Sequence, residues 1–273
     1  MTQWPDRVVL VGAGKMGGAM ASGWLDAGLA ASSLAILEPN PSPEVAALAS
    51  ARGVALNPEI AALATPDVMA LAVKPQSLGP VAAQVAPLAG EGTLVLSILA
   101  GKTTANLRTR FPRARAFVRA MPNTPAAIRR GVTAAYANFE VNAAQRRWSE
   151  SLFGAVGSFH WLEDETAIDA VTAISGSGPA YVFALTEALA AAAEKLGLPA
   201  DLSMRLARGT VEGAGELMRR RSATGPATLR RDVTSPGGTT AAALAVLQGA
   251  GGLDDLIARA AAAACARAGE MAG

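Results

Sequence analysis

The chain has 273 residues, of which 51% are hydrophobic and 17% are charged, and its formal net charge at pH 7 is +2. Such a composition forms one large folded domain or two ordinary ones and excludes an intrinsically disordered chain. The longest basic run is residues 219–221, which is typical of a solvated helix end, so no nucleic-acid partner is expected.

Cys265 is the only cysteine, so no disulfide can form within the chain, and we expect a cytoplasmic protein. No cluster of Cys, His and acidic residues has metal-ligand spacing, so no metal site is expected. The first residues do not have the pattern of a signal peptide. The most apolar helix, residues 180–198, carries Glu187, Glu194 and Lys195, which favours a buried helix of a soluble protein over a membrane span.

Strands and helices alternate in the first half of the chain. Short apolar runs predict strands at residues 7–12, 33–40, 67–75, 93–101, 115–125 and 131–138, and a last strand at 157–162. Helical segments are predicted at residues 19–28, 43–51, 79–89 and 103–111. This alternation predicts a parallel sheet with crossover helices.

The second half is rich in alanine and has no further strand pattern. Helices are predicted at residues 164–174, 178–197, 199–220, 238–251 and 253–269. The expected fold is therefore α/β, with an N-terminal Rossmann-type parallel-sheet domain over residues 1–162 and a C-terminal all-helical domain over residues 163–273. The helical part has so many small apolar residues that we expect it to self-associate.

The segment "VVLVGAGKMGGAM" contains a dinucleotide-binding fingerprint. Gly12, Gly14 and Gly17 have the spacing G-x-G-x-x-G between a predicted strand and a predicted helix. Gly12 permits the turn, Gly14 lets a pyrophosphate approach the backbone, and Gly17 lets the helix pack on the strand. The helix N-terminus then offers N–H groups to the phosphates.

Glu38 follows the second predicted strand, where an acidic residue accepts hydrogen bonds from a ribose diol and repels a 2′-phosphate. No Arg or Lys lies between Lys15 and Arg52, so the sequence favours NADH over NADPH. Asn40 and Ser42 could still bind a phosphate, and this alternative stays open.

The chain has one histidine, His160, beside Trp161, and we expect it to be packed and structural rather than catalytic. Residues 173–189 resemble the interdomain helix of the β-hydroxyacid dehydrogenases, but Val182 and Leu185 stand where that family has a lysine and an asparagine. Without these groups, reduction of a readily protonated C=N bond is the natural chemistry for a nicotinamide enzyme.

Five segments resemble the pyrroline-5-carboxylate reductases: "GAGKMGGAM", "AVKP", "RAMPNTPA", "DAVTAISGSGPAYVF" and "DVTSPGGTT", in this order over nearly the full length. The resemblance implies reduction of 1-pyrroline-5-carboxylate to L-proline by NADH or NADPH, the last step of proline biosynthesis. It also implies a homodimer held by interlocking helices, which can assemble into a decamer as a pentamer of dimers.

The resemblance also implies the site residues. The coenzyme site would consist of Gly12, Gly14, Lys15, Met16, Gly17, Glu38, Pro39, Asn40, Ala72, Val73, Lys74, Pro75, Ser97, Ala100 and Gly101, the last three on the nicotinamide side. The substrate site would consist of Asn123, Ser235, Gly238, Thr239 and Thr240. Backbone N–H groups at residues 235–239 would bind the substrate carboxylate, and Thr240, the expected catalytic residue, would hydrogen-bond the ring nitrogen.

The segment "DVTSPGGTT" therefore predicts a turn that leads into a new helix start, where an anion is bound without a lysine. One departure is Ala223, which stands where relatives often have a glutamate, so the role of that acid is in doubt. Two alternatives remain open: a related imine or keto-acid reductase on the same scaffold, and a non-catalytic dinucleotide-binding protein.

Overall fold

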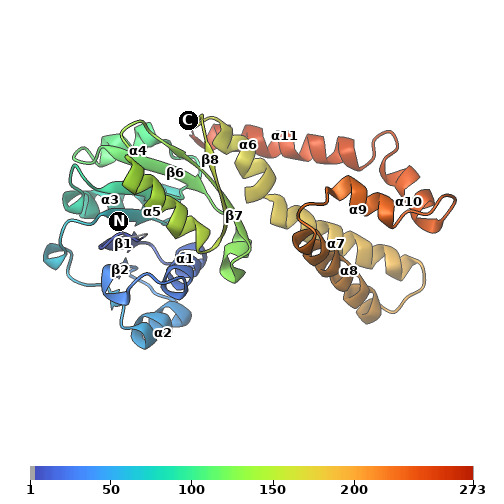
Figure 1. Cartoon of the computed structure of the whole chain (residues 1–273), viewed down its shortest axis with the longest axis horizontal. Coiled ribbons are helices and arrows are strands. Elements are labelled where there is room, and N and C mark those ends of the chain that lie inside the picture. The colour runs from blue at the N-terminus through green and yellow to red at the C-terminus, as the bar shows by residue number, and fades with distance from the viewer. Residues whose placement is uncertain (1–3, 273) are drawn as a thin grey trace. The chain divides into compact units, whose positions relative to one another are not determined.

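The computed structural model describes residues 4–272, which pack as two compact units (Figure 1). The first unit comprises the chain up to Gly176 and residues 264 onward, and the second comprises Ser177–Ala263. The predicted boundary after residue 162 lies before this division. Residues 163–176 belong to the same unit as the sheet, because they are hydrogen-bonded to it. In one of these bonds, the Asn123 Nδ2 group donates to the Ser175 carbonyl at 2.9 Å.

Within the described residues, one eight-stranded sheet has the order β3-β2-β1-β4-β5-β6-β7-β8. The strands are β1 (Val8–Val11), β2 (Leu34–Leu37), β3 (Ala55–Leu56), β4 (Val68–Leu71), β5 (Leu94–Ser97), β6 (Ala116–Met121), β7 (Gly131–Ala137) and β8 (Gly157–Leu162). Strands β1 to β6 pair in parallel, β7 is antiparallel to β6, and β8 is parallel to β7. The predicted α/β fold is thus confirmed as a mostly parallel sheet.

Helices connect the strands and form the second unit. They are α1 (Lys15–Asp26), α2 (Pro43–Arg52), α3 (Leu78–Val85), α4 (Thr104–Arg110), α5 (Ala143–Gly154), α6 (Ala167–Val171), α7 (Gly178–Lys195), α8 (Ala200–Arg220), α9 (Pro226–Asp232), α10 (Thr239–Leu247) and α11 (Leu253–Ala272). A π-helical turn, Thr172–Gly176, lies between α6 and α7.

The structure adds three elements that the sequence pattern did not predict: β3, α5 and α9. Helix α5 begins with a capping box, in which the side chains of Asn142 and Gln145 accept each other's backbone N–H groups. This pair of residues in the sequence could have predicted the start of the helix. The sheet departs from a purely parallel one at β7, and the sequence analysis did not predict this. The short connection between β6 and β7 cannot hold a crossover helix, so the chain returns antiparallel.

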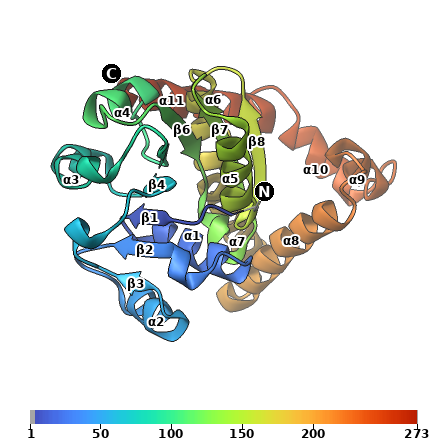
Figure 2. The ribbon, with the colours of Figure 1, turned by 60° about the vertical axis from the view of Figure 1, so that its left-hand side comes forward.

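Both faces of the sheet are covered, as Figure 2 shows. Side chains such as Leu10 and Ile36 pack with α1 and α5 on one face, where the buried Trp24 donates its Nε1–H to the Leu152 carbonyl at 2.8 Å. Val11 and Met69 belong to the cluster on the other face. Strands buried on both faces are continuous apolar runs, which is why the sequence pattern identified them.

The second unit has little core of its own. Of α7, only Ala190 is buried, so the expectation of a buried apolar helix is wrong for the single chain. By length and composition alone, the helical stretch Ala167–Lys195 is long and apolar enough to cross a membrane. Core helices of soluble proteins satisfy the same criterion, and the expectation that this stretch does not span a membrane stays a prediction.

Candidate coenzyme and substrate sites

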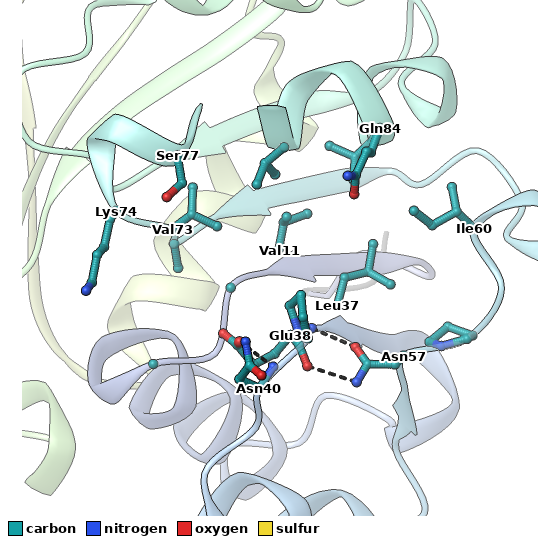
Figure 3. Close-up of a pocket in the computed structure, with 17 residues that line it drawn as sticks. Val11, Leu37, Glu38, Asn40, Asn57, Ile60, Val73, Lys74, Ser77 and Gln84 are labelled. Atoms are coloured by element: carbon teal, nitrogen blue, oxygen red, sulfur yellow. Dashed lines mark hydrogen bonds between the residues drawn. The ribbon is translucent and has the colours of Figure 1, made fainter. Parts of the chain in front are cut away.

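A cavity of about 620 Å³ lies at the carboxyl ends of β1, β2 and β4 (Figure 3). Strand β1 has β2 on one side and β4 on the other, so the connections leave it in opposite directions at this edge. Open parallel sheets bind their ligands at such a switch point. The cavity is lined by Val11, Gly12, Gly14, Leu37, Glu38, Pro39, Asn40, Asn57, Pro58, Ile60, Ala72, Val73, Lys74, Ser77, Val81, Gln84 and Val85.

The glycine-rich loop after β1 borders this cavity. Gly12 has φ +90°, and a Cβ there would lie 2.8 Å from the Ala72 carbonyl oxygen. A Cβ on Gly17 would clash with the Gly12 carbonyl, whereas one on Gly14 would meet no atom within 4 Å. Gly12 and Gly17 are thus required for packing, and Gly14 keeps space free in front of the N-terminus of α1, which a pyrophosphate fits.

Glu38 is held in place by backbone groups. Its Oε2 accepts the Ala13 N–H at 2.9 Å, and its Oε1 accepts the Asn40 N–H at 3.1 Å. The side chain of Asn57 bonds the Glu38 backbone twice, accepting its N–H and donating to its carbonyl, at 2.8 Å each. Figure 3 shows Glu38 and Asn57 joined by these bonds on one side of the pocket, with Lys74 and Ser77 on the other.

Eight predicted coenzyme residues line the cavity, namely Gly12, Gly14, Glu38, Pro39, Asn40, Ala72, Val73 and Lys74. Lys15, Met16 and Gly17 form the first turn of α1, and Pro75 begins the 3₁₀ turn that precedes α3. Asn57 lines the cavity but was missed in the sequence. Its Asn-Pro dipeptide marks a turn, and its φ of +52° is a conformation that Asn adopts more readily than most residues.

The residues predicted on the nicotinamide side follow β5 and do not line this cavity. Ser97 is fully buried, and its Oγ accepts the Leu99 N–H at 3.2 Å. Ala100 and Gly101 lie in the loop that leads to α4. Asn123 lies two residues after β6 and is 7% exposed. Its side-chain amide accepts the Val132 N–H and donates to the Ser175 carbonyl. Its contact with substrate stays a prediction.

The predicted substrate turn lies in the helical unit. Gly237 has φ +72°, Gly238 is the N-cap of α10, and α10 begins at Thr239, as the sequence predicted. The Gly238 N–H bonds the Ser235 carbonyl at 3.0 Å, and no side chain caps the helix. The first N–H groups of a helix have no partners within it, so this exposed end can bind a small carboxylate.

His160 is placed differently from the expectation of a packed residue. It points outward from β8 and is exposed, while its neighbours Phe159 and Trp161 pack edge to face at 4.8 Å on the other side of the strand. Alternation of side chains along a strand explains the error, because Trp161 and His160 cannot share a face.

In the part of the chain described, no group of three His, Cys, Asp or Glu side chains could hold a metal ion.

Two family models match the chain. Residues 7–101 match the NADP oxidoreductase, coenzyme F420-dependent family, and residues 165–271 match the pyrroline-5-carboxylate reductase dimerisation family. The first covers the glycine-rich loop and β1 to β5, and the second covers α6 to α11 and the substrate turn.

Full-length relatives agree with these matches. The chain is 40% identical over 266 residues to the pyrroline-5-carboxylate reductase of Pseudomonas aeruginosa, with 97% of each chain covered. The solved structure of the Coxiella burnetii pyrroline-5-carboxylate reductase has a TM-score of 0.90 at 34% identity, covering 98% of this chain and 99% of that one. The Plasmodium falciparum pyrroline carboxylate reductase, solved with NADP bound, has a TM-score of 0.81 at 29% identity and covers 98% of each chain.

Proposed function

The chain belongs to the pyrroline-5-carboxylate reductase family and reduces 1-pyrroline-5-carboxylate to L-proline with NAD(P)H, and on this premise we propose that it uses NADH in preference to NADPH. The preference rests on one observation, the Glu38 carboxylate that lines the coenzyme cavity and is held by two backbone N–H groups. A carboxylate fixed there accepts the ribose hydroxyls of NADH and repels the 2′-phosphate of NADPH.

The loop after Glu38 supports the same proposal. The Ser42 side chain accepts the Val45 N–H at 3.4 Å as the N-cap of α2. It also hydrogen-bonds the Glu44 carboxylate, which, with a backbone hydrogen bond, lowers the pKa of Glu44, so this acid is ionised at neutral pH. Ser42 is thus engaged within the protein, and a second negative charge lies nearby. Both features oppose a 2′-phosphate.

The coenzyme supplies a hydride when bound, and the residues of this chain hold and orient the reactants. The glycine-rich loop and the first turn of α1 bind the pyrophosphate, Glu38 binds the adenosine ribose, and residues 72–75 contact the nicotinamide ribose. In the helical unit, backbone N–H groups at the start of α10 bind the substrate carboxylate. The Thr240 Oγ1 hydroxyl hydrogen-bonds the ring nitrogen of the substrate. It helps to supply or share the proton of this nitrogen as the imine becomes an amine.

The functional assembly is an oligomer, since residues 165–271 match a dimerisation family. The large apolar side chains exposed on α7, Val182, Phe183, Leu185 and Leu189, are the surface that a second copy covers in this proposal. A pentamer of such dimers is the larger assembly that we propose. Light scattering of the purified protein distinguishes a dimer from a decamer.

The coenzyme proposal is tested by oxidation of NADH and of NADPH, measured separately with pyrroline-5-carboxylate. We expect a higher kcat/KM with NADH than with NADPH. In Glu38→Ser this preference should fall about tenfold, which corresponds to ~1.4 kcal/mol, because the charge that repels the 2′-phosphate is removed. Glu44→Gln is the control, because Glu44 does not line the cavity, and its preference should change less. A wild-type enzyme that uses NADPH about tenfold better would overturn the proposal.

A further inference from the structure

The loop between β5 and α4, residues 98–103, contains Ala100 and Gly101, which are predicted to lie on the nicotinamide side of the coenzyme. The end of this loop is bonded to a side chain from the segment that precedes α6. The Glu165 carboxylate accepts the Thr104 N–H on Oε1 and the Thr104 Oγ1–H on Oε2, both at 2.7 Å. Thr104 is the first residue of α4, so an acid from another part of the sequence binds both donors at the end of this loop.

A buried cation stands behind Glu165. Arg119 on β6 is only 3% exposed, and its guanidinium lies 3.5 Å from Glu165 Oε1 and 3.5 Å from Asp169 Oδ1. In the sheet, Arg119 is the register partner of Ser97, the last residue of β5. The charge is thus buried directly beside the start of the loop, and it requires the two carboxylates as partners.

The loop also contacts the C-terminal part of α11. Gly101 has φ +66°, and a Cβ there would clash with the backbone carbonyl of Met271. Backbone therefore packs against backbone at this point. Together with the bonds of Glu165, this contact holds the loop at two points within the sheet unit.

We propose that Glu165 is a positioning residue for the nicotinamide half of the coenzyme. Arg119 fixes the Glu165 carboxylate, and the bonds from this carboxylate to Thr104 fix the position of residues 98–103. This inference rests on the proposed function only in that residues 98–103 contact the nicotinamide ring. A loop that is already ordered loses less conformational entropy when the nicotinamide ring binds. The coenzyme therefore binds more tightly than it would bind to a disordered loop.

The inference separates the two halves of the coenzyme. ADP-ribose has every group of NADH except the nicotinamide ring, so the ratio of the two dissociation constants isolates that ring. In Glu165→Ala we expect the Kd for NADH to rise about tenfold, which corresponds to the loss of a charge-assisted hydrogen bond, while the Kd for ADP-ribose stays within about twofold. Both constants are measured by titration without substrate.

Glu140→Ala is the matched control. Glu140 is 22% exposed and pairs with Arg108 at 2.7 Å, much as Glu165 is 21% exposed and pairs with Arg119. It lies outside the loop, so neither Kd should change. Equal weakening of NADH and ADP-ribose in Glu165→Ala, or no weakening of either, would overturn the inference.

Thr104→Ala serves where Glu165→Ala fails to fold, since it keeps the backbone N–H and removes only the hydroxyl bond to Glu165. Its Kd for NADH should rise about threefold with ADP-ribose unchanged, as expected for one hydrogen bond. An unchanged ratio would contradict the inference. Because these titrations need no imine substrate, a failure of the reductase activity would leave their result interpretable and would count against the proposed function alone.

Discussion

The coenzyme pocket and the substrate turn are built in opposite ways. The pocket lies at the edge of a buried sheet, and its main polar side chain, Glu38, is held through Ala13, Asn40 and Asn57. The substrate turn lies between α9 and α10, where Ser235 and Thr239 are exposed and no side chain caps the helix. The pocket is organised within one chain, whereas the turn offers backbone groups on a surface with little core beneath it.

This difference indicates what each region needs to become functional. A preorganised pocket binds its ligand without further ordering. The helical unit exposes Phe183, Leu185 and Leu189, which a second copy covers in the proposed dimer. We therefore expect the pocket and the turn to respond differently to substitutions, and four variants test this contrast.

The largest effect is expected from Phe183→Glu. Phe183 is 63% exposed on α7 in the single chain, and burying a charge at an interface without a partner costs several kcal/mol, about a hundredfold or more in association. We expect dissociation of the dimer in light scattering and loss of reductase activity. Phe139→Glu, at a residue 90% exposed in the sheet unit, is the control and should keep both. A fully active dimer of Phe183→Glu would break the contrast.

The next effect is expected from Thr240→Ala, which should lower kcat/KM at least about tenfold, because its hydroxyl combines a hydrogen bond with assistance to proton transfer. If the hydroxyl moves the proton, the loss falls on kcat and grows as pH rises. Thr239→Ala should lose less, since the backbone of that residue binds the carboxylate. Steady-state kinetics across pH 6–9 provide the measurement, and equal activity of wild type and Thr240→Ala would leave the turn as an anion site only.

A smaller effect is expected from Asn57→Gly. Glycine keeps the positive φ of this position and removes both side-chain bonds to the Glu38 backbone. The NADH preference should narrow by about threefold, less than in Glu38→Ser, because the carboxylate remains but is less well fixed. The ratio of kcat/KM for NADH and NADPH reports the change. An unaltered ratio would show that the contacts of Ala13 and Asn40 are sufficient to position Glu38.

The smallest effect is expected from His160→Gln. The side chain is exposed on β8, so its loss neither opens a cavity nor removes a packed partner of Trp161. Both kcat and the thermal midpoint should be close to those of wild type. A loss of about a hundredfold in kcat, with folding intact, would instead make His160 a general acid.

Much of the fold and of the candidate site could be predicted from local patterns. The glycine-rich loop, the buried strands β1, β4 and β5, and the start of α10 are each determined by residues close together in the chain. These three features depend on local properties, namely the φ angles that glycine permits, apolar runs buried on both faces of a sheet, and helix-start signals. The antiparallel direction of β7 was not predicted, and the prediction that His160 is packed was wrong.

By itself, the sequence determined the family motifs and their order, and it predicted the roles of Glu38 and Thr240. Only the tertiary structure showed that Asn57 fixes the Glu38 backbone and that Glu165 binds Thr104, with the buried Arg119 behind it. These contacts join residues that are far apart in the chain, and their partners are brought together by sheet order and crossover connections. Side-chain identity sets which bonds a residue can make, and the packing of distant segments decides which bond it forms.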